Sequence, residues 1–265
     1  MDYSVLVVSC DKNIELLNCF FKYYKKYFSI SNNIYLSLEK KDYKFPGLKI
    51  NTIKGGKQDW SSRVKKALDC IKTNSVLVLL DDFIIEKSVD TRELQKLACL
   101  LNHHDNIAMF ALTTVPMSNA STKIHYGKYY ERSRFGRYKV TLQAGMWRKE
   151  ILKSLLKNGE NAWEVEVFAN IRSFPMNKKF YAICSKKLKP IIYNEGLFCV
   201  QGKQNEKEIT RLSNKFGEDL HIKGMPSNHG LLIRDETPFN KRIVRRMKII
   251  LYQVKYYLIT LLKRG

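Results

Sequence analysis

Short apolar runs alternate with helical patterns through the first half of the chain, and this alternation constrains the fold more than any other feature. The runs typical of strands are Val5–Ser9, Asn33–Leu38, Leu48–Thr52, Val76–Leu80 and Ile107–Leu112. The segments between them with apolar residues at helical spacing are Ile14–Tyr27, Ser61–Ile71 and Thr91–Leu101. Strand–helix alternation predicts an α/β fold in which helices flank both faces of a mostly parallel, Rossmann-like sheet.

The second half of the chain has a less regular pattern. We expect helices over Trp147–Leu156, Trp163–Ile171 and Asn205–Phe216, and strands over Phe180–Cys184 and Ile191–Tyr193. The segment Ser118–Lys139 is polar, rich in Tyr and Arg, and without clear periodicity. It is too long for an ordinary connection, so we interpret it as a functional loop.

Composition limits the classes of protein that the chain can belong to. With 265 residues, 45% of them hydrophobic, it can bury a substantial core, and we expect one domain with an appendage. Lys and Arg number 47 against 25 Asp and Glu, which gives a formal charge of +22. An excess of this size indicates a polyanionic partner such as nucleic acid, anionic lipid or a phosphate-bearing ligand. An AT-rich genome, which favours Lys codons, is the competing explanation for part of the excess.

Cysteine usage and hydropathy indicate the compartment. The six cysteines are scattered without a CxxC pair, which is typical of reduced, buried thiols. The first residues carry no basic segment or cleavage site, so we expect no signal peptide. No run reaches the roughly 20 apolar residues that a spanning helix needs. The sequence therefore predicts a cytoplasmic protein.

Acidic residues follow two of the predicted strands directly. The first strand leads into Ser9 and Asp11, and the fourth leads into Asp81 and Asp82. Ligands of open α/β sheets bind beyond the carboxyl ends of the strands, where the strand order reverses. Adjacent carboxylates after a buried strand need a cation, a hydroxyl donor or a helix N-terminus, so we favour a binding site over a simple turn cap.

The residues before the fourth strand could also contact a ligand. Walker and GxGxxG motifs are both absent, so these phosphate-binding loops cannot be invoked. Instead, Asp59 and Trp60 open a predicted helix on which Arg63 can reach a phosphate. A solvated helix face is the competing interpretation of Arg63.

These motifs, taken in order, resemble bacterial glycosyltransferases of the GT-A fold that use nucleotide sugars. The matching segments are Val-Leu-Val-Val-Ser-Cys-Asp near the N-terminus, Asp59-Trp60-Ser61 with Arg63, Leu-Leu-Asp-Asp-Phe, Leu142–Arg148 and Glu160–Glu166. The resemblance spans Ser4 to Phe168 and is closest to enzymes that build O-antigen, capsule or lipopolysaccharide glycans. It implies a GT-A-like fold and transfer of a sugar from a nucleoside diphosphate to a saccharide acceptor, which we expect to be lipid-linked.

The resemblance also implies roles for individual residues. Those expected to bind the nucleotide sugar are Ser9, Asp11, Asp59, Trp60, Arg63, Asp81, Asp82, Gln143 and Gly145. Asp81 and Asp82 stand where the family has an Asp-x-Asp-type motif, so Asp82 is the expected ligand of a divalent cation, Mn²⁺ or Mg²⁺. Phe83 replaces the third acid, which weakens the metal assignment.

A carboxylate near Trp163 is expected to deprotonate the acceptor if the reaction inverts. Glu164 and Glu166 are two residues apart and therefore about 200° apart around a helix, so only one can face a pocket. The family pattern favours Glu166, with Glu164 as the alternative. Both could instead be solvated helix charges.

The segment after residue 238 differs from the rest of the chain. Residues 240–264 carry eight basic residues and no acidic one. An apolar stripe at three- and four-residue steps predicts an amphipathic helix on the inner face of the cytoplasmic membrane, although the stripe could instead pack on the body or on a second subunit. The stripe is Ile243, Met247, Ile250, Val254, Tyr257 and Leu261. We therefore divide the chain into a catalytic domain, 1–238, with a nucleotide-sugar half (1–117) and an acceptor half (118–238), and a membrane-associating helix, 239–265.

Two other functions are compatible with parts of the sequence. A basic nucleic-acid-binding module accounts for the charge but leaves Asp81 and Asp82 unexplained. A nucleotidyltransferase would share the paired acids but should have a basic loop near the first strand, where only Lys12 is found. We expect a nucleotide-sugar donor, a saccharide acceptor and an anionic membrane surface as partners, and no nucleic acid.

Overall fold

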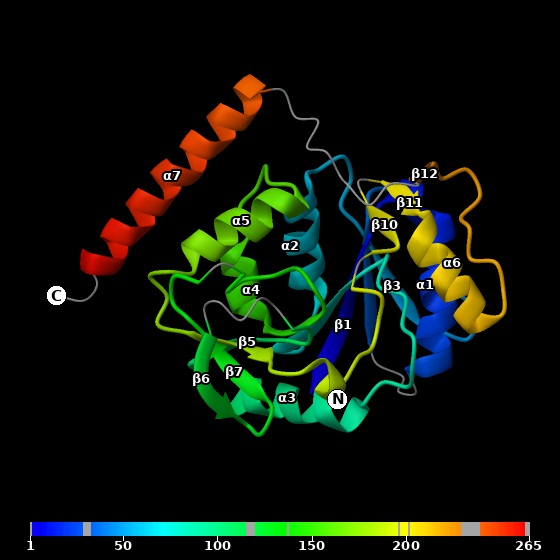
Figure 1. Cartoon of the computed structure of the whole chain (residues 1–265), viewed down its shortest axis with the longest axis horizontal. Coiled ribbons are helices and arrows are strands. Elements are labelled where there is room, and N and C mark those ends of the chain that lie inside the picture. The colour runs from blue at the N-terminus through cyan, green and yellow to red at the C-terminus, as the bar shows by residue number, and fades with distance from the viewer. Residues whose placement is uncertain are drawn as a thin grey trace.

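The computed structural model describes residues 2–28, 33–114, 120–136, 138–195, 197–200, 202–228 and 239–262. It confirms the predicted α/β architecture, with helices on both faces of a large sheet and a long helix near the C-terminus (Figure 1).

Nine strands form the main sheet in the order β3-β2-β1-β4-β8-β5-β9-β7-β6. They are β1 (Tyr3–Val8), β2 (Ile34–Leu38), β3 (Ile50–Lys54), β4 (Ser75–Leu80), β5 (Ile107–Ala111), β6 (Ala120–His125), β7 (Tyr129–Arg132), β8 (Gly145–Arg148) and β9 (Lys179–Ile183). A second, small sheet contains β10 (Cys199–Val200), β11 (Lys203–Asn205) and β12 (Ser227–Asn228).

Strand order reverses next to β1. The chain runs outward from β1 to β2 and β3, and then returns to place β4 on the other side of β1, with all four strands parallel. The carboxyl ends of β1 and β4 therefore flank a topological switch point, which is where ligands bind in sheets of this kind.

Helices cover both faces of the sheet because the buried strands are apolar on both sides. In β1, Val5 and Val7 point to one core and Leu6 and Val8 to the other. The first core is covered by α1 (Ile14–Tyr27), α3 (Thr91–His103) and α6 (Glu206–Phe216). The second is covered by α2 (Trp60–Cys70), α4 (Lys149–Leu155) and α5 (Ala162–Arg172), which lie together in Figure 1. Short 3₁₀ turns, η1 (Asp11–Asn13) and η3 (Lys186–Leu188), follow β1 and β9.

The helix predicted over Trp147–Leu156 is partly wrong. Residues Gly145–Arg148 form β8, which pairs antiparallel with β4 on one side and β5 on the other, and α4 begins only at Lys149. Trp147 is almost fully buried in this strand. A short apolar run fits a buried strand and a buried helix turn equally well, so periodicity could not separate them.

Two other segments also differ from the prediction. The expected loop Ser118–Lys139 contains the antiparallel hairpin β6–β7, with Gly127 at a φ of +79° in its turn, while residues 115–119 and 137 lie outside the described part of the chain. The strand expected over Ile191–Tyr193 is reduced to a single bridge between Ile85 and Tyr193.

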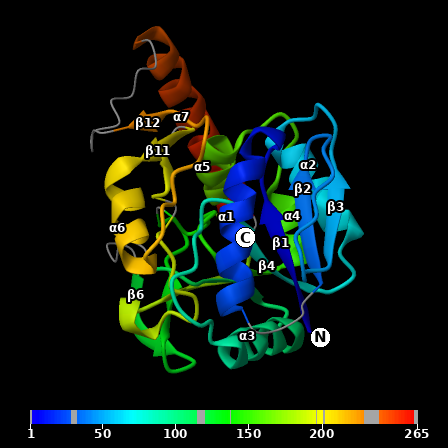
Figure 2. The same cartoon turned by 90° about the vertical axis from the view of Figure 1, so that its right-hand side faces the viewer.

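The predicted C-terminal helix is present as α7 (Phe239–Leu262) and lies along one edge of the molecule in Figures 1 and 2. Its contacts with the body are mainly with α5. Among the described residues, no helix is both long enough and apolar enough to cross a membrane.

Candidate functional site

The first acid after β4 is held inside the protein. Asp81 is buried and accepts hydrogen bonds through Oδ2 from the Ser9 hydroxyl and from Asn13 Nδ2, the latter at 2.9 Å. Burial raises the pKa of Asp81, and these two donors lower it in part. Asp81 therefore joins the carboxyl ends of β1 and β4 across the switch point.

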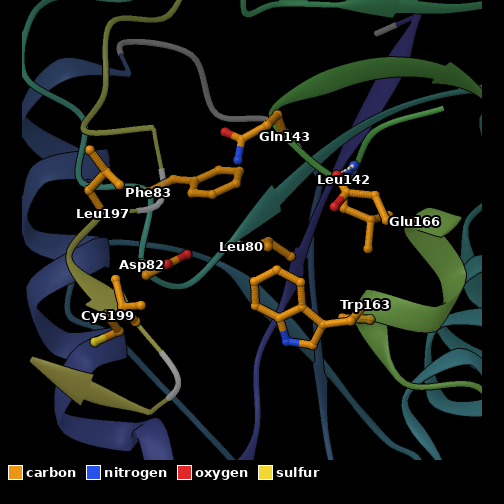
Figure 3. Close-up of a pocket in the computed structure, with 11 residues that line it drawn as sticks. Leu80, Asp82, Phe83, Leu142, Gln143, Trp163, Glu166, Leu197 and Cys199 are labelled. Carbon is orange, nitrogen blue, oxygen red and sulfur yellow. Dashed lines mark hydrogen bonds between the residues drawn. The ribbon is translucent and has the colours of Figure 1, made fainter. Parts of the chain in front are cut away.

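The second acid faces a pocket. Burial and the adjacent Asp81 carboxylate raise the pKa of Asp82 to about 8. Its side chain lines a cavity of about 300 Å³ and points into it in Figure 3. Two neighbouring carboxylates in one dry site cannot both ionise without a counter-charge, so Asp82 is a group that a cation or a proton will occupy at neutral pH.

Asp11 organises the loop after β2. Its carboxylate accepts backbone N–H bonds from Glu39, Lys40 and Lys41 at 3.0–3.2 Å. Although burial raises the pKa of Asp11, these three bonds lower it more. The Glu39 carboxylate in turn accepts the Asp11 backbone N–H. The ends of β1 and β2 are thereby fixed next to each other.

Arg63 connects this loop to α2. Its Nη1 donates to the Ser9 carbonyl at 2.9 Å, and its Nη2 lies 3.2 Å from Glu39 Oε1. The guanidinium is buried, so the solvated-face interpretation of Arg63 is wrong. Glu39 was not among the predicted site residues, although it directly follows a parallel strand, as Asp81 does, and the same criterion would have found it.

Asp59 is the N-cap of α2. Its carboxylate accepts the Ser62 N–H at 2.9 Å and the hydroxyls of Ser61 and Ser62 at 2.8 and 2.6 Å. These donors lower the pKa of Asp59 despite its partial burial. Trp60 follows it, half-buried against the core beneath α2. Asp59 and Trp60 therefore set the start of α2 and the position of Arg63, and neither lines the cavity.

Residues from four parts of the chain line the cavity (Figure 3). They are Leu80, Asp82, Phe83, Leu142, Gln143, Ala162, Trp163, Glu166, Leu197, Cys199 and Val200. Trp163 is 65% exposed and presents an aromatic face at the cavity. Gln143 is oriented by the Tyr193 hydroxyl, which donates to Gln143 Oε1 at 2.8 Å.

The two glutamates of α5 have different environments. Glu166 lines the cavity, and its Oε1 accepts hydrogen bonds from Thr141 Oγ1 and the Leu142 N–H, both at 3.0 Å. Glu164 instead completes a capping box with Asn161 at the start of α5 and does not line the cavity. Asp82 and Glu166 approach the cavity from opposite sides in Figure 3.

Gly145, expected to contact the donor, lies inside β8. A Cβ there would come within 2.7 Å of the Met109 methyl and 3.1 Å of Trp147 Nε1. The glycine is explained by close packing within the sheet, and it does not line the cavity.

Lys12 is a second residue that the sequence analysis left out of the site. Its charge lowers the pKa of Asp81, so it lies near the paired acids. A Cβ at Gly202 would be 3.5 Å from Lys12 Nζ, which places the ammonium beside the turn between β10 and β11. Lys12 is exposed and lies in the turn that follows β1.

The donor set at this site suits a cation shared with a ligand. No group of three or more His, Cys, Asp or Glu side chains that could hold a metal occurs in the described ranges. Burial and the neighbouring Asp81 raise the pKa of the Asp82 carboxyl, and Mg²⁺ is commonly bound by one or two carboxylates together with substrate phosphates. The residues therefore fit a substrate-bridged divalent cation better than a cation held by the protein alone.

Comparison with known proteins gives matches to solved structures only. No family model and no curated protein matches the sequence. Similar structures include residues 1–349 of S. aureus TarS in complex with UDP-GlcNAc, with a TM-score of 0.47 at 15% identity over 70% of this chain and 57% of that one. A second structure of the same fragment gives a TM-score of 0.46 at 13% identity, over 69% and 57%. The 2-C-methyl-D-erythritol 4-phosphate cytidylyltransferase from Thermus thermophilus gives a TM-score of 0.36 at 15% identity, over 63% of this chain and 84% of that one. The chain thus spans less than two thirds of the TarS fragment.

Proposed function

We propose that the protein is a glycosyltransferase that moves a sugar from a nucleoside diphosphate to a saccharide acceptor. The observation that carries the proposal is the cavity at the switch point, where Asp82 after β4 and Glu166 on α5 face a shared space beside the exposed ring of Trp163. Transfer from a diphosphate needs a positive charge to neutralise the departing diphosphate and a separate proton acceptor; Asp82 would hold a cation for the first, and Glu166 would be the second.

The donor side of the site lies at the ends of β1 and β4. The nucleoside diphosphate would lie near Ser9 and Asp81, with Lys12 as an exposed positive charge for the phosphates. Asp82 would hold a divalent cation, Mn²⁺ or Mg²⁺, which neutralises charge on the diphosphate when bound. Arg63, held by Ser9 and Glu39, keeps these strand ends in place.

The acceptor side lies against α5. An acceptor hydroxyl attacks the anomeric carbon, the bond from that carbon to the diphosphate oxygen breaks, and the hydroxyl proton passes to Glu166. Oε1 of Glu166 is held by Thr141 and Leu142, which fixes the carboxylate toward the cavity. The Trp163 face offers a stacking surface for a sugar ring.

The acceptor in this proposal is a lipid-linked saccharide, and the pathway is bacterial surface polysaccharide synthesis, such as that of O-antigen, capsule or lipopolysaccharide. The sequence resemblance and the basic C-terminal segment support this part. Such an acceptor would be met at the inner face of the cytoplasmic membrane.

A ligand panel followed by a transfer assay tests the proposal. Nucleoside diphosphates and nucleotide sugars, each with and without Mn²⁺ or Mg²⁺, should raise the melting temperature, because a ligand at about 100 times its Kd stabilises by about 2.7 kcal/mol. With the donor that binds, Glu166→Gln should lower kcat by roughly 10²–10⁴-fold while the donor-induced thermal shift persists. Glu164→Gln, on the same helix but in the capping box, is the matched control and should retain activity.

Three results would contradict the proposal. Salt-sensitive binding to nucleic acid with no shift from any nucleotide would indicate a nucleic-acid-binding module. Release of pyrophosphate from a nucleoside triphosphate would indicate a nucleotidyltransferase. Normal turnover in Glu166→Gln would exclude its role as the proton acceptor.

A further inference from the structure

Among the described residues, helix α7 attaches to the body mainly through one side. Ile249, Tyr252 and Tyr256 pack against the cluster of Phe168, Ile171 and Phe174 at α5. The rings of Tyr252 and Phe168 are 4.8 Å apart, and Lys157 Nζ donates to the Tyr252 hydroxyl at 3.0 Å. This side of α7 is therefore packed against the rest of the protein.

The opposite side of α7 is apolar and largely uncovered by protein among the described residues. At 100° per residue, the residues opposite Tyr252 and Tyr256 fall within one arc of about 140°. They are all large and between 49% and 82% exposed: Met247, Ile250, Leu251, Val254, Tyr257, Leu258, Leu261 and Leu262. Five of them belong to the stripe predicted from the sequence, so that stripe is not the face that packs on the body.

One edge of this surface contacts the body through Tyr257. The rings of Tyr257 and Phe135 are 5.6 Å apart, and Phe135 is itself half-exposed. The apolar surface therefore continues from α7 onto the residues after β7. An exposed apolar surface of this kind, on a monomeric protein, marks a site of interaction.

Charge distinguishes between the partners that could cover this face. Residues 239–265 contain eight basic side chains and no acidic one, and Lys241, Lys248 and Lys255 recur every seven residues, which places them along one side of the helix. If two copies of the chain met through α7, their two basic segments would lie close together and their positive charges would repel each other. An anionic bilayer neutralises the same charges while it accepts the apolar side chains.

We propose that the outward face of α7, defined by the eight exposed residues above, docks the protein on an anionic membrane, with α7 parallel to the surface and the body held by the Tyr252–Tyr256 side. The apolar side chains enter the boundary between headgroups and acyl chains, and the basic side chains contact the headgroups. This inference stands on α7 alone and does not depend on the nature of the reaction.

Vesicle co-sedimentation of the full chain tests this docking. Vesicles of phosphatidylcholine with phosphatidylglycerol should bind the protein, and binding should fall as NaCl rises from about 0.1 M to about 0.5 M. Leu258→Glu places a carboxylate in the middle of the outward face and should weaken binding at least roughly tenfold. Leu188→Glu makes the same change at an exposed leucine in η3, outside α7, and should bind as the wild type does.

Folding and donor binding are measured on the same proteins. Leu258 is half-exposed and faces away from the body, so Leu258→Glu should keep the wild-type melting temperature and any nucleotide-induced thermal shift. Equal binding to pure phosphatidylcholine vesicles, or unchanged binding of Leu258→Glu, would overturn the proposal. A dimer in sedimentation equilibrium that Leu258→Glu dissociates would assign the face to a second copy, and would overturn it too.

Discussion

Asp82 is an acid whose environment opposes its charge. Its pKa of about 8 in the folded protein lies well above the ordinary value of 3.8, so between these values the folded state keeps a proton that the unfolded state has lost. Stability therefore falls as pH rises from about 4 to about 8, and levels off above that.

Asp82→Asn should remove this pH dependence. We expect the melting temperature of the ligand-free variant to exceed that of the wild type by more at pH 8 than at pH 5, because the wild type carries the repelled carboxylate only at the higher pH. Differential scanning fluorimetry at both pH values measures this. A difference between the two proteins that does not change with pH would mean that the Asp82 carboxyl titrates as an ordinary acid.

Lys12 should contribute to donor binding without taking part in proton transfer. A charged contact with a phosphate is worth about 1.5–3 kcal/mol, so Lys12→Gln should raise the donor KM by roughly 10–100-fold and change kcat much less. Lys96→Gln, at an exposed lysine on α3, serves as the control. If both variants have the wild-type KM, the diphosphate does not contact Lys12.

At the scale of elements, the position of α5 decides where Trp163 and Glu166 lie. Arg172 at the end of α5 forms a buried, bidentate pair with Glu160, with both N–O distances at 2.7 Å, and also donates to the Leu155 carbonyl. The Ser61 backbone N–H donates to the Glu160 carbonyl at 3.1 Å, which ties the start of α2 to the same loop.

Glu160→Ala should therefore destabilise the fold by about 3–5 kcal/mol, because it leaves the Arg172 charge buried without an opposite charge. Chemical denaturation gives the free energy of unfolding directly. Glu150→Ala, at an exposed acid on α4, should change it by less than about 0.5 kcal/mol. If Glu160→Ala lowers the free energy of unfolding no more than Glu150→Ala does, water replaces Glu160 as the partner of Arg172 at little cost in stability.

Elements with strong local signals agree with the prediction to within one or two residues. The helix expected over Ile14–Tyr27 is α1, and Asn161 with Glu164 caps α5 as a capping box that is readable in the sequence. The prediction failed at β8, a strand of four residues, three of them buried, which pairs with strands that are distant in the chain. Local periodicity contains no information on such partners.

At the scale of the whole molecule, β8 joins the two halves of the catalytic region. It lies between β4 and β5, so residues from the expected acceptor half complete the sheet of the expected nucleotide half. A sheet shared in this way cannot come apart without breaking both sets of backbone hydrogen bonds.

We therefore expect a single cooperative unfolding transition for the body. Far-UV circular dichroism and tryptophan fluorescence should give the same midpoint in urea, and a fragment of residues 1–117 should not fold, because β4 and β5 would lose the strand between them. Two separate transitions, or a folded 1–117 fragment, would mean that the halves are independent domains.

The sequence by itself determined the α/β class, the five strands of the first half, the helices between them, and the acids at the ends of β1 and β4. The strands and helices follow from side-chain periodicity, which is a local property, and the shared position of the acids follows from the general rule that parallel strands end at a common edge. The tertiary structure alone decided that Lys12 lies beside the turn between β10 and β11, and that Glu166 reaches the cavity. It also decided which side of α7 stays exposed. Each of these outcomes depends on contacts between residues far apart in the chain, and such contacts are fixed only when the sheet and helices pack.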